Sequence, residues 1–315
     1  MTPDGMPYTY DLNRRSRQVP SWVVRDHVIT FDRPIVVGIV NVTPDSFSDG
    51  GALPDDDAAV AHAARLVEEG ADILDVGGES TRPGSAPVSA GEELRRILNV
   101  IRELTARWPH IPLSVDTTKS EVARAALDAG ARIVNDVSGL RFDDDMAALC
   151  AATGAGLVLV HSRGGPGELA SYDRADYRNL IPDVIGDLYD RAAAASAAGV
   201  EDERIVLDPG IGFSKRSEHS LAVLAGLEGL RGLRFPLLVG VSRKRVIGEL
   251  SGRTVPAERV AGTIAANVVA LERGASLFRV HDVRAHREAL DVAWAIVQAG
   301  PSRLDGWILR EAGAE

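Results

Sequence analysis

The sequence predicts an α/β protein: a single-domain (β/α)8 TIM barrel with a short N-terminal arm and a hairpin or plug before the sheet. From residue 35 on, short apolar segments alternate with amphipathic stretches over about 265 residues, the length of such a barrel. The apolar segments carry few charges, as parallel strands buried on both faces do. A doubly wound open sheet is the alternative fold, but its glycine fingerprint is missing from the sequence.

The predicted elements follow one another in a regular order. Apolar runs rich in β-branched residues predict strands at residues 35–41, 73–77, 112–116, 133–136, 156–161, 205–208, 237–241 and 277–280. Helical periodicity predicts helices at residues 56–69, 90–108, 120–129, 143–153, 178–198, 217–224, 243–250 with 257–273, and 285–299. Glycines mark several helix ends, namely Gly70, Gly130, Gly154, Gly199 and Gly274.

The two ends of the chain differ from this repeating part. Residues 1–22 are polar and predict a flexible N-terminal arm, and residues 301–315 predict a C-terminal tail. Residues 23–31 alternate between apolar and polar types before an Asp-Arg-Pro turn, which predicts a hairpin or plug strand. We therefore expect the barrel domain to span residues 23–300.

Composition and charge exclude several classes of protein. The chain has 315 residues, with 35 Lys and Arg against 45 Asp and Glu, a net charge of −10. An acidic chain without a long basic run is a poor candidate for nucleic-acid binding. Cys150 is the only cysteine, which excludes disulfides within the chain and fits a reducing cytoplasm. We expect no secretory signal and no membrane span, because no stretch approaches about 20 apolar residues.

The first predicted barrel strand ends in an unusual loop. The apolar run of residues 35–40 passes through Asn41 into a polar segment that ends in two glycines at residues 50 and 51. The carboxyl ends of parallel strands face the ligand in this fold class, so a mobile functional loop is the favoured interpretation. An ordinary strand-to-helix connection with an Asx turn at Asp45 is the alternative.

Polar residues follow nearly every predicted strand. Taken singly, such a residue is more often a helix cap than a ligand, but the repeated pattern favours a site at one rim of the barrel. The sequence segments concerned are Asn41, DVGGESTRPG, DTTK, Asn135-Asp136, HSRG, DPGIGFSK, Ser242-Arg243-Lys244 and RVHD.

These residues separate into two chemical groups. Asp116, Asn135 and Asp208 would form a polar floor that suits a flat, donor-rich heterocycle such as a pterin, because buried acceptors need hydrogen-bond donors. The second group is cationic and suits a phosphate or diphosphate at the mouth of the pocket. It comprises Arg82, Lys244, Arg279 and His281, with the Asn41 amide.

Less specific readings exist for several of these residues. Lys244 is also compatible with a solvated helix start, and His281 with a surface histidine. We interpret Lys215 and Arg216 as loop charges, and four other histidines, His62, His110, His219 and His286, as structural. No zinc-peptidase, P-loop or Ser-His-Asp pattern is present.

Eight segments together carry a family resemblance. They occur in the order GIVNVTPDSFSDGG, DVGGESTRPGS, SVDTTK, VNDVSG, HSRG, DPGIGFSK, SRK and RVHDV. This series resembles dihydropteroate synthase from about residue 35 to residue 299; the first two segments and DPGIGFSK are the most specific. Ser214 in the glycine-rich loop and Val160 before His161 are small departures from the family pattern.

The resemblance implies an enzyme, a transferase of folate biosynthesis and sulfonamide target that condenses 6-hydroxymethyl-7,8-dihydropterin diphosphate with 4-aminobenzoate. No covalent enzyme intermediate is needed for this reaction, which is consistent with a lone cysteine far from the strand-end segments. By resemblance, Mg²⁺ would bind Asn41, and whether Asp49 is a second ligand is left open. The implied catalytic residues are Asp116, Asp208, Lys244 and Arg279. The implied substrate contacts are Thr81, Arg82, Asp116, Asn135, Asp208, Phe213, Ser242, Lys244, Arg279 and His281.

Two alternatives to this function are a pterin-dependent methyltransferase domain and a non-catalytic pterin-binding homologue. The methyltransferase domain should lack the TPDSFSDGG loop and the RVHDV segment, and this chain has both. A non-catalytic homologue should show broken motifs, and none is broken. We expect a cytoplasmic protein with small-molecule substrates and no nucleic-acid or membrane partner. We also expect a homodimer, because barrels of this kind often pair through outer helices.

Overall fold

Eight parallel strands form the core of the protein. The computed structural model describes residues 21–43, 56–80 and 85–311, and side chains as far as residue 299. The barrel strands are β3 (Ile35–Asn41), β4 (Ile73–Gly77), β5 (Leu113–Asp116), β6 (Ile133–Asp136), β7 (Gly156–Val160), β8 (Ile205–Asp208), β9 (Leu238–Val239) and β10 (Leu277–Val280). Each strand pairs with the next, β10 returns to β3, and a bridge between Leu207 and Leu237 joins β8 to the segment before β9. The predicted barrel is confirmed, and the open sheet is excluded.

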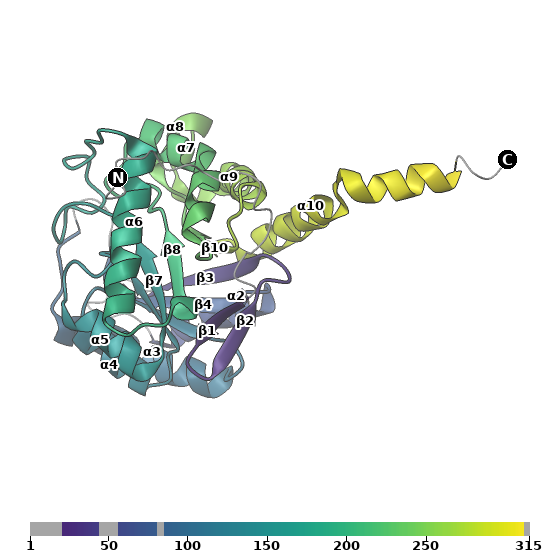
Figure 1. The fold of residues 1–315 in the computed structure, drawn as a ribbon. Coiled ribbons are helices and arrows are strands. Elements are labelled where there is room, and N and C mark those ends of the chain that lie inside the picture. The colour runs from purple at the N-terminus through teal and green to yellow at the C-terminus, as the bar shows by residue number, and fades with distance from the viewer. Residues whose placement is uncertain (1–20, 44–55, 81–84, 312–315) are drawn as a thin grey trace.

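Helices surround this barrel, as Figure 1 shows. They are α2 (Asp56–Glu68), α3 (Ala90–Arg107), α4 (Ser120–Asp128), α5 (Asp145–Thr153), α6 (Leu180–Ala197), α7 (Ser217–Ala225), α8 (Arg245–Ser251), α9 (Val260–Glu272) and α10 (Val283–Glu311), with 3-10 turns η1 (Asp202–Arg204), η2 (Leu227–Leu233) and η3 (Pro256–Arg259). Helix α3 shows why these segments form helices. Its buried Ile97, Ile101 and Leu104 recur at helical spacing, and Ser89 caps its first turn by accepting a hydrogen bond from the Glu92 amide.

Several predicted boundaries differ from the structure, among them those of β9, α5 and α10. Strand β9 has only two residues, whereas residues 237–241 were predicted. Helix α5 begins at Asp145 rather than at residue 143. The Asp143 carboxylate accepts hydrogen bonds from the backbone N–H groups of Ser120 and Asp145, and this keeps Asp143 outside the helix. Helix α10 continues to Glu311, past the predicted end at residue 299, and its far part extends away from the barrel (Figure 1).

An antiparallel hairpin precedes the barrel, as predicted. It consists of β1 (Ser21–Val24) and β2 (His27–Thr30), so it begins two residues before the expected domain boundary. The Trp22 side chain is buried among residues from the first positions of the barrel strands, such as Ile133, and its Nε1 donates to the Arg204 carbonyl at 2.8 Å. The hairpin therefore closes the end of the barrel opposite the strand carboxyl ends.

Replacing Trp22 with alanine is expected to lower the free energy of unfolding by about 3–5 kcal/mol, because the barrel interior loses its largest buried side chain. Urea denaturation of both proteins measures this difference. Val28→Ala on the same hairpin is the matched control: Val28 is 55% exposed, and its loss should change stability by no more than about 0.5 kcal/mol. Equal effects of the two substitutions would show that the hairpin does not seal the barrel.

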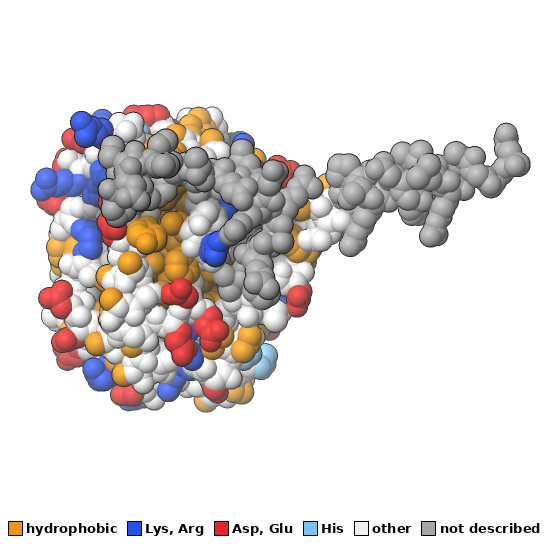
Figure 2. All heavy atoms as spheres, in the orientation of Figure 1, with side chains coloured by type: hydrophobic (Ala, Val, Ile, Leu, Met, Phe, Trp, Pro, Cys, Tyr) orange, Lys and Arg blue, Asp and Glu red, His pale blue; other side chains and the backbone are white. Residues whose placement is uncertain are grey.

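The outer surface has mixed charge. On the face shown in Figure 2, acidic and basic side chains are interspersed over the barrel helices. Within the described ranges, no helix has both the length and the apolar character needed to cross a lipid bilayer. Cys150 is buried in α5, and burial raises the pKa of its thiol to about 12, so the thiol is kept protonated and unreactive.

Candidate active site

An arginine near the carboxyl end of β10 is held by two acids from β4 and β5, which lie beyond β3 in the sheet. The Arg279 Nε donates to Asp75 Oδ2 and its Nη2 donates to Asp116 Oδ2, each at 2.6 Å. Burial alone would lower the pKa of Arg279, but the two carboxylates outweigh it and raise that pKa. Burial raises the pKa of Asp116 to about 7, although Arg279 opposes the shift. A guanidinium held along its edges keeps its planar face available for stacking.

Asp75, which lies on β4, also contacts β6. Asn135 on β6 donates from Nδ2 to Asp75 Oδ2 at 3.2 Å, and both side chains are buried. Two acceptor atoms of this pair, the other carboxylate oxygen of Asp75 (Oδ1) and the amide oxygen of Asn135 (Oδ1), are buried without a hydrogen-bond partner. A small cavity of about 10 Å³ lies between these residues and Trp22. Unpartnered buried acceptors favour a ligand rich in N–H donors.

A second acid lies at the end of β8. Asp208 Oδ1 accepts the Gly210 backbone N–H at 2.7 Å, which anchors the DPGIGFSK loop to the strand. Burial raises the pKa of Asp208, and the Lys244 ammonium opposes this shift. Lys244 contacts the Ile211 carbonyl and lies 4.0 Å from the centre of the Phe213 ring. Burial lowers the pKa of Lys244 to about 8, although Asp208 opposes this shift. The buried Asp208 and the half-buried Lys244 thus influence one another through charge.

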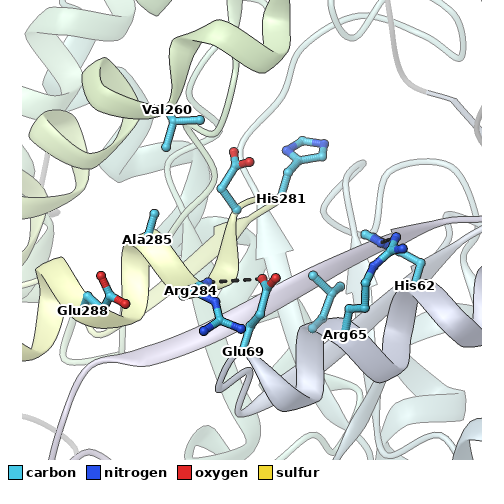
Figure 3. Close-up of a pocket in the computed structure, with 10 residues that line it drawn as sticks. His62, Arg65, Glu69, Val260, His281, Arg284, Ala285 and Glu288 are labelled. Carbon is cyan, nitrogen blue, oxygen red and sulfur yellow. Dashed lines mark hydrogen bonds between the residues drawn. The ribbon is translucent and has the colours of Figure 1, made fainter.

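His281 and Ser242 lie together at the ends of β10 and β9. The Ser242 Oγ and the His281 Nδ1 are 3.0 Å apart, and the His281 backbone N–H donates to the same hydroxyl at 3.2 Å. His281 also lines a cavity of about 370 Å³ between α2 and the start of α10 (Figure 3). Basic side chains of His62, Arg65 and Arg284 share this cavity with the acids Glu69, Asp282 and Glu288.

Known proteins match this chain over most of its length. The family described as "Pterin binding enzyme" matches residues 37–281. A dihydropteroate synthase of Mycobacterium leprae is 46% identical over 280 residues, 86% of this chain and 98% of that relative. The Xanthomonas albilineans dihydropteroate synthase with 4-aminobenzoic acid has a TM-score of 0.82 at 48% identity, covering 90% of this chain and 99% of that chain. The chain belongs to the dihydropteroate synthase family.

A further structure supports the same membership. The Xanthomonas albilineans dihydropteroate synthase in complex with 7,8-dihydropteroate has a TM-score of 0.80 at 46% identity, covering 90% of this chain and 100% of that chain. As a dihydropteroate synthase homologue, the chain is a transferase of folate biosynthesis.

The structure brings most of the residues expected for a dihydropteroate synthase into three groups. These are Arg279 with Asp116 and, through Asp75, Asn135; Lys244 with Phe213 and, through charge alone, Asp208; and Ser242 with His281. Asn41 lies at the end of β3, where it pairs with Gly77 of β4. Thr81, Arg82 and Asp49 lie outside the described residues.

The predicted separation into a polar floor and a basic mouth is wrong for Arg279 and Lys244. Arg279 and Lys244 lie among the floor acids and compensate their charge, because buried carboxylates are too costly without counter-charges. Two residues were also misjudged. Asp75 was seen at a strand end but given no role, and Lys215, interpreted as a loop charge, is only 1% exposed.

Proposed function

We propose that the chain condenses 6-hydroxymethyl-7,8-dihydropterin diphosphate with 4-aminobenzoate to give 7,8-dihydropteroate and diphosphate. The observation that carries this proposal is the ring of buried acids and amides at the strand ends, with an arginine between Asp75 and Asp116. We assign the reaction to the barrel of residues 23–300, and no part of it to the arm or the tail.

The pterin ring is assigned to the floor of this pocket. Asp208 and Asn135 offer carboxylate and amide oxygens to the N–H edge of the ring, and a carboxylate is the usual partner for a guanidine-like edge. Lys244 contributes the complementary donor beside Asp208. Arg279, held by Asp75 and Asp116, offers its face to the ring.

The diphosphate is assigned to the side of the pocket near β3 and β10. Arg279 supplies a positive charge on β10, and His281 supplies an imidazole just after this strand. No group of three or more His, Cys, Asp or Glu side chains is placed to hold a metal within residues 21–43, 56–80 and 85–299. Mg²⁺ fits here nonetheless, because this ion usually binds through substrate phosphates and water with only one or two protein oxygens. Asn41 would supply one such oxygen.

The residues at the site suit a reaction through a cationic pterin methylene. The bond between that carbon and the diphosphate oxygen breaks, and the diphosphate leaves with the electron pair. Carboxylates of Asp116 and Asp208 stabilise the positive charge that develops on the pterin. The amine nitrogen of 4-aminobenzoate then forms the new C–N bond and releases a proton. Bound Mg²⁺ would neutralise charge on the leaving diphosphate.

The second substrate is assigned to the loops beside the pterin pocket. Phe213 lies next to Lys244, and Ser242 precedes that lysine by two positions, so both can border the aminobenzoate ring. Thr81 and Arg82 are assigned here by family resemblance. Attack by the amine requires this ring to lie in line with the breaking C–O bond.

The direct test is release of diphosphate when the purified protein is mixed with both substrates and Mg²⁺. Omission of 4-aminobenzoate should stop the release, and dihydropteroate should form in equal amount. Diphosphate release that does not need 4-aminobenzoate would point to hydrolysis, and no release would contradict the proposed reaction.

Removal of Mg²⁺ is expected to lower turnover at least about tenfold, because the charge of the leaving diphosphate is then not neutralised. The measurement compares rates in excess EDTA with rates after Mg²⁺ is restored in excess over the chelator. Equal turnover with and without the chelator would contradict a role for the ion.

We also propose that the chain forms a homodimer through its outer helices. Leu221 on α7, Leu250 on α8 and Val255 after α8 are exposed apolar side chains, and α7 contacts α8. Light scattering after gel filtration should give twice the chain mass. Leu250→Glu should shift the protein towards the monomer; a monomeric parent protein would contradict the proposal.

A further inference from the structure

A buried lysine lies behind the proposed pterin pocket. The Lys215 side chain is 1% exposed, and its Nζ lies 2.7 Å from His161 Nδ1 and 3.2 Å from each of the Gly210 and Phe213 carbonyl oxygens. An ammonium group has three N–H donors, and here three acceptors surround it. Burial lowers the pKa of Lys215 well below its usual value, although the Asp208 carboxylate opposes this shift. A neutral amine would satisfy only two of the three acceptors, so the hydrogen-bond geometry favours the charged form.

His161 links this lysine to an outer helix. Its Nε2 lies 3.0 Å from Asp187 Oδ2 on α6, and the ring is fully buried. Burial, with the charge of Lys215, lowers the pKa of His161 to about 3, so the ring is neutral. The Asp187 carboxylate therefore fixes the tautomer in which Nε2 carries the proton and Nδ1 accepts from Lys215.

Asp187 is ionised and also binds Arg163. Burial would raise the pKa of Asp187, but its hydrogen bonds with His161 and Arg163 lower that pKa to about 2. The chain of contacts thus runs from the surface of α6 through His161 to the loop after β8. Because each group in this chain of contacts has a partner, we expect the loop after β8 to have a fixed geometry.

The loop held by Lys215 carries two groups of the proposed site. Gly210 is tied to Asp208 through its backbone N–H, and it lies so close to the His161 carbonyl that a Cβ there would come within 1.8 Å of that oxygen. Phe213, at the other end of the loop, has its ring against Lys244. Strand β8 also fixes Asp208, whereas the Phe213 carbonyl is held by Lys215.

We propose that Lys215, oriented by His161 and Asp187, is a positioning residue that fixes Phe213 at the aminobenzoate side of the site. The inference rests on the proposed function. Lys215 touches neither substrate, so it acts through the carbonyls of Gly210 and Phe213. Loss of its ammonium should therefore affect the aminobenzoate more than the pterin, whose acid Asp208 is held by the sheet.

The test is Lys215→Met, which keeps the length of the side chain and removes the ammonium group. The KM for 4-aminobenzoate should rise at least about tenfold, while the KM for dihydropterin diphosphate should change less than about threefold. A purely structural lysine would instead lower the melting temperature and leave the ratio of the two KM values unchanged, and that result would overturn the proposal.

A second pair of variants covers the case in which Lys215→Met does not fold. Asp187 is partly exposed, so Asp187→Asn should fold, and it should raise the KM for 4-aminobenzoate several-fold because the His161 tautomer is held less firmly. Asp183→Asn is the matched control, since Asp183 lies one turn earlier on α6 and faces the same Arg163 without touching His161. Equal KM values in both variants would overturn the proposal.

The parent protein is assayed beside each variant. If the parent releases no diphosphate, the proposed function fails and takes this inference with it. If the parent turns over and the ratio of KM values stays unchanged in Lys215→Met and Asp187→Asn, only the positioning role fails.

Discussion

Arg279→Ala is expected to lower kcat at least about a hundredfold, because the site loses the group that faces both the pterin and the leaving diphosphate. The same change leaves Asp75 and Asp116 as neighbouring carboxylates without their shared counter-charge. Without Arg279, burial and the charge of Asp75 should raise the pKa of Asp116 further, which removes the negative charge that Asp116 is assigned for stabilising the cationic pterin. Steady-state diphosphate release measures the effect.

The control for Arg279→Ala is Arg253→Ala. Arg253 is an exposed arginine with a long ion pair to Glu258, and its replacement should leave the rate within about twofold. Thermal denaturation of both variants separates loss of turnover from loss of fold. A folded Arg279→Ala protein with a near-normal rate would contradict the assignment.

Asp208→Asn is expected to lower turnover by a similar factor, at least about a hundredfold. Asparagine has the same shape and keeps an oxygen for the Gly210 N–H, so the loop should stay in place. What is lost is the charge that pairs with Lys244 and that would stabilise the cationic pterin. The kinetic measurement should therefore show an effect on kcat as well as on the KM for the pterin.

Asp190→Asn on the outer surface of α6 is the matched control for this charge removal, since Asp190 is exposed. Its turnover should equal that of the parent protein. If Asp208→Asn were as active as Asp190→Asn, the acid at the end of β8 would have no part in the reaction.

Most barrel strands could be predicted from the sequence to the residue. Strands β3, β4, β6, β8 and β10 begin and end where the apolar runs do, because strands buried on both faces leave a continuous apolar signal. Strands β5 and β7 differ by one residue at one end, and strand β9 differs most. Its apolar run covers residues 237–241, but only Leu238 and Val239 make the strand, since pairing depends on the neighbouring strands as well as on side-chain type.

The sequence could predict which residues belong to the site, but not which of them contact one another. Asp116, Asn135 and Asp208 were identifiable because polar residues at strand ends stand out against apolar runs. The pairing of Arg279 with Asp75 joins residues 204 positions apart and depends on the register of β10 against β3 and β4. Lys215 looks like a surface charge in sequence, because nothing local shows that His161 lies behind it.

A crystal structure of the protein with 6-hydroxymethyl-7,8-dihydropterin diphosphate tests the central claim most directly. The pterin ring should lie at the carboxyl ends of the strands, between Asp208 and Asn135, with the face of Arg279 against it and the diphosphate towards His281. A ring bound instead in the cavity between α2 and α10, or at the hairpin end of the barrel, would contradict the account.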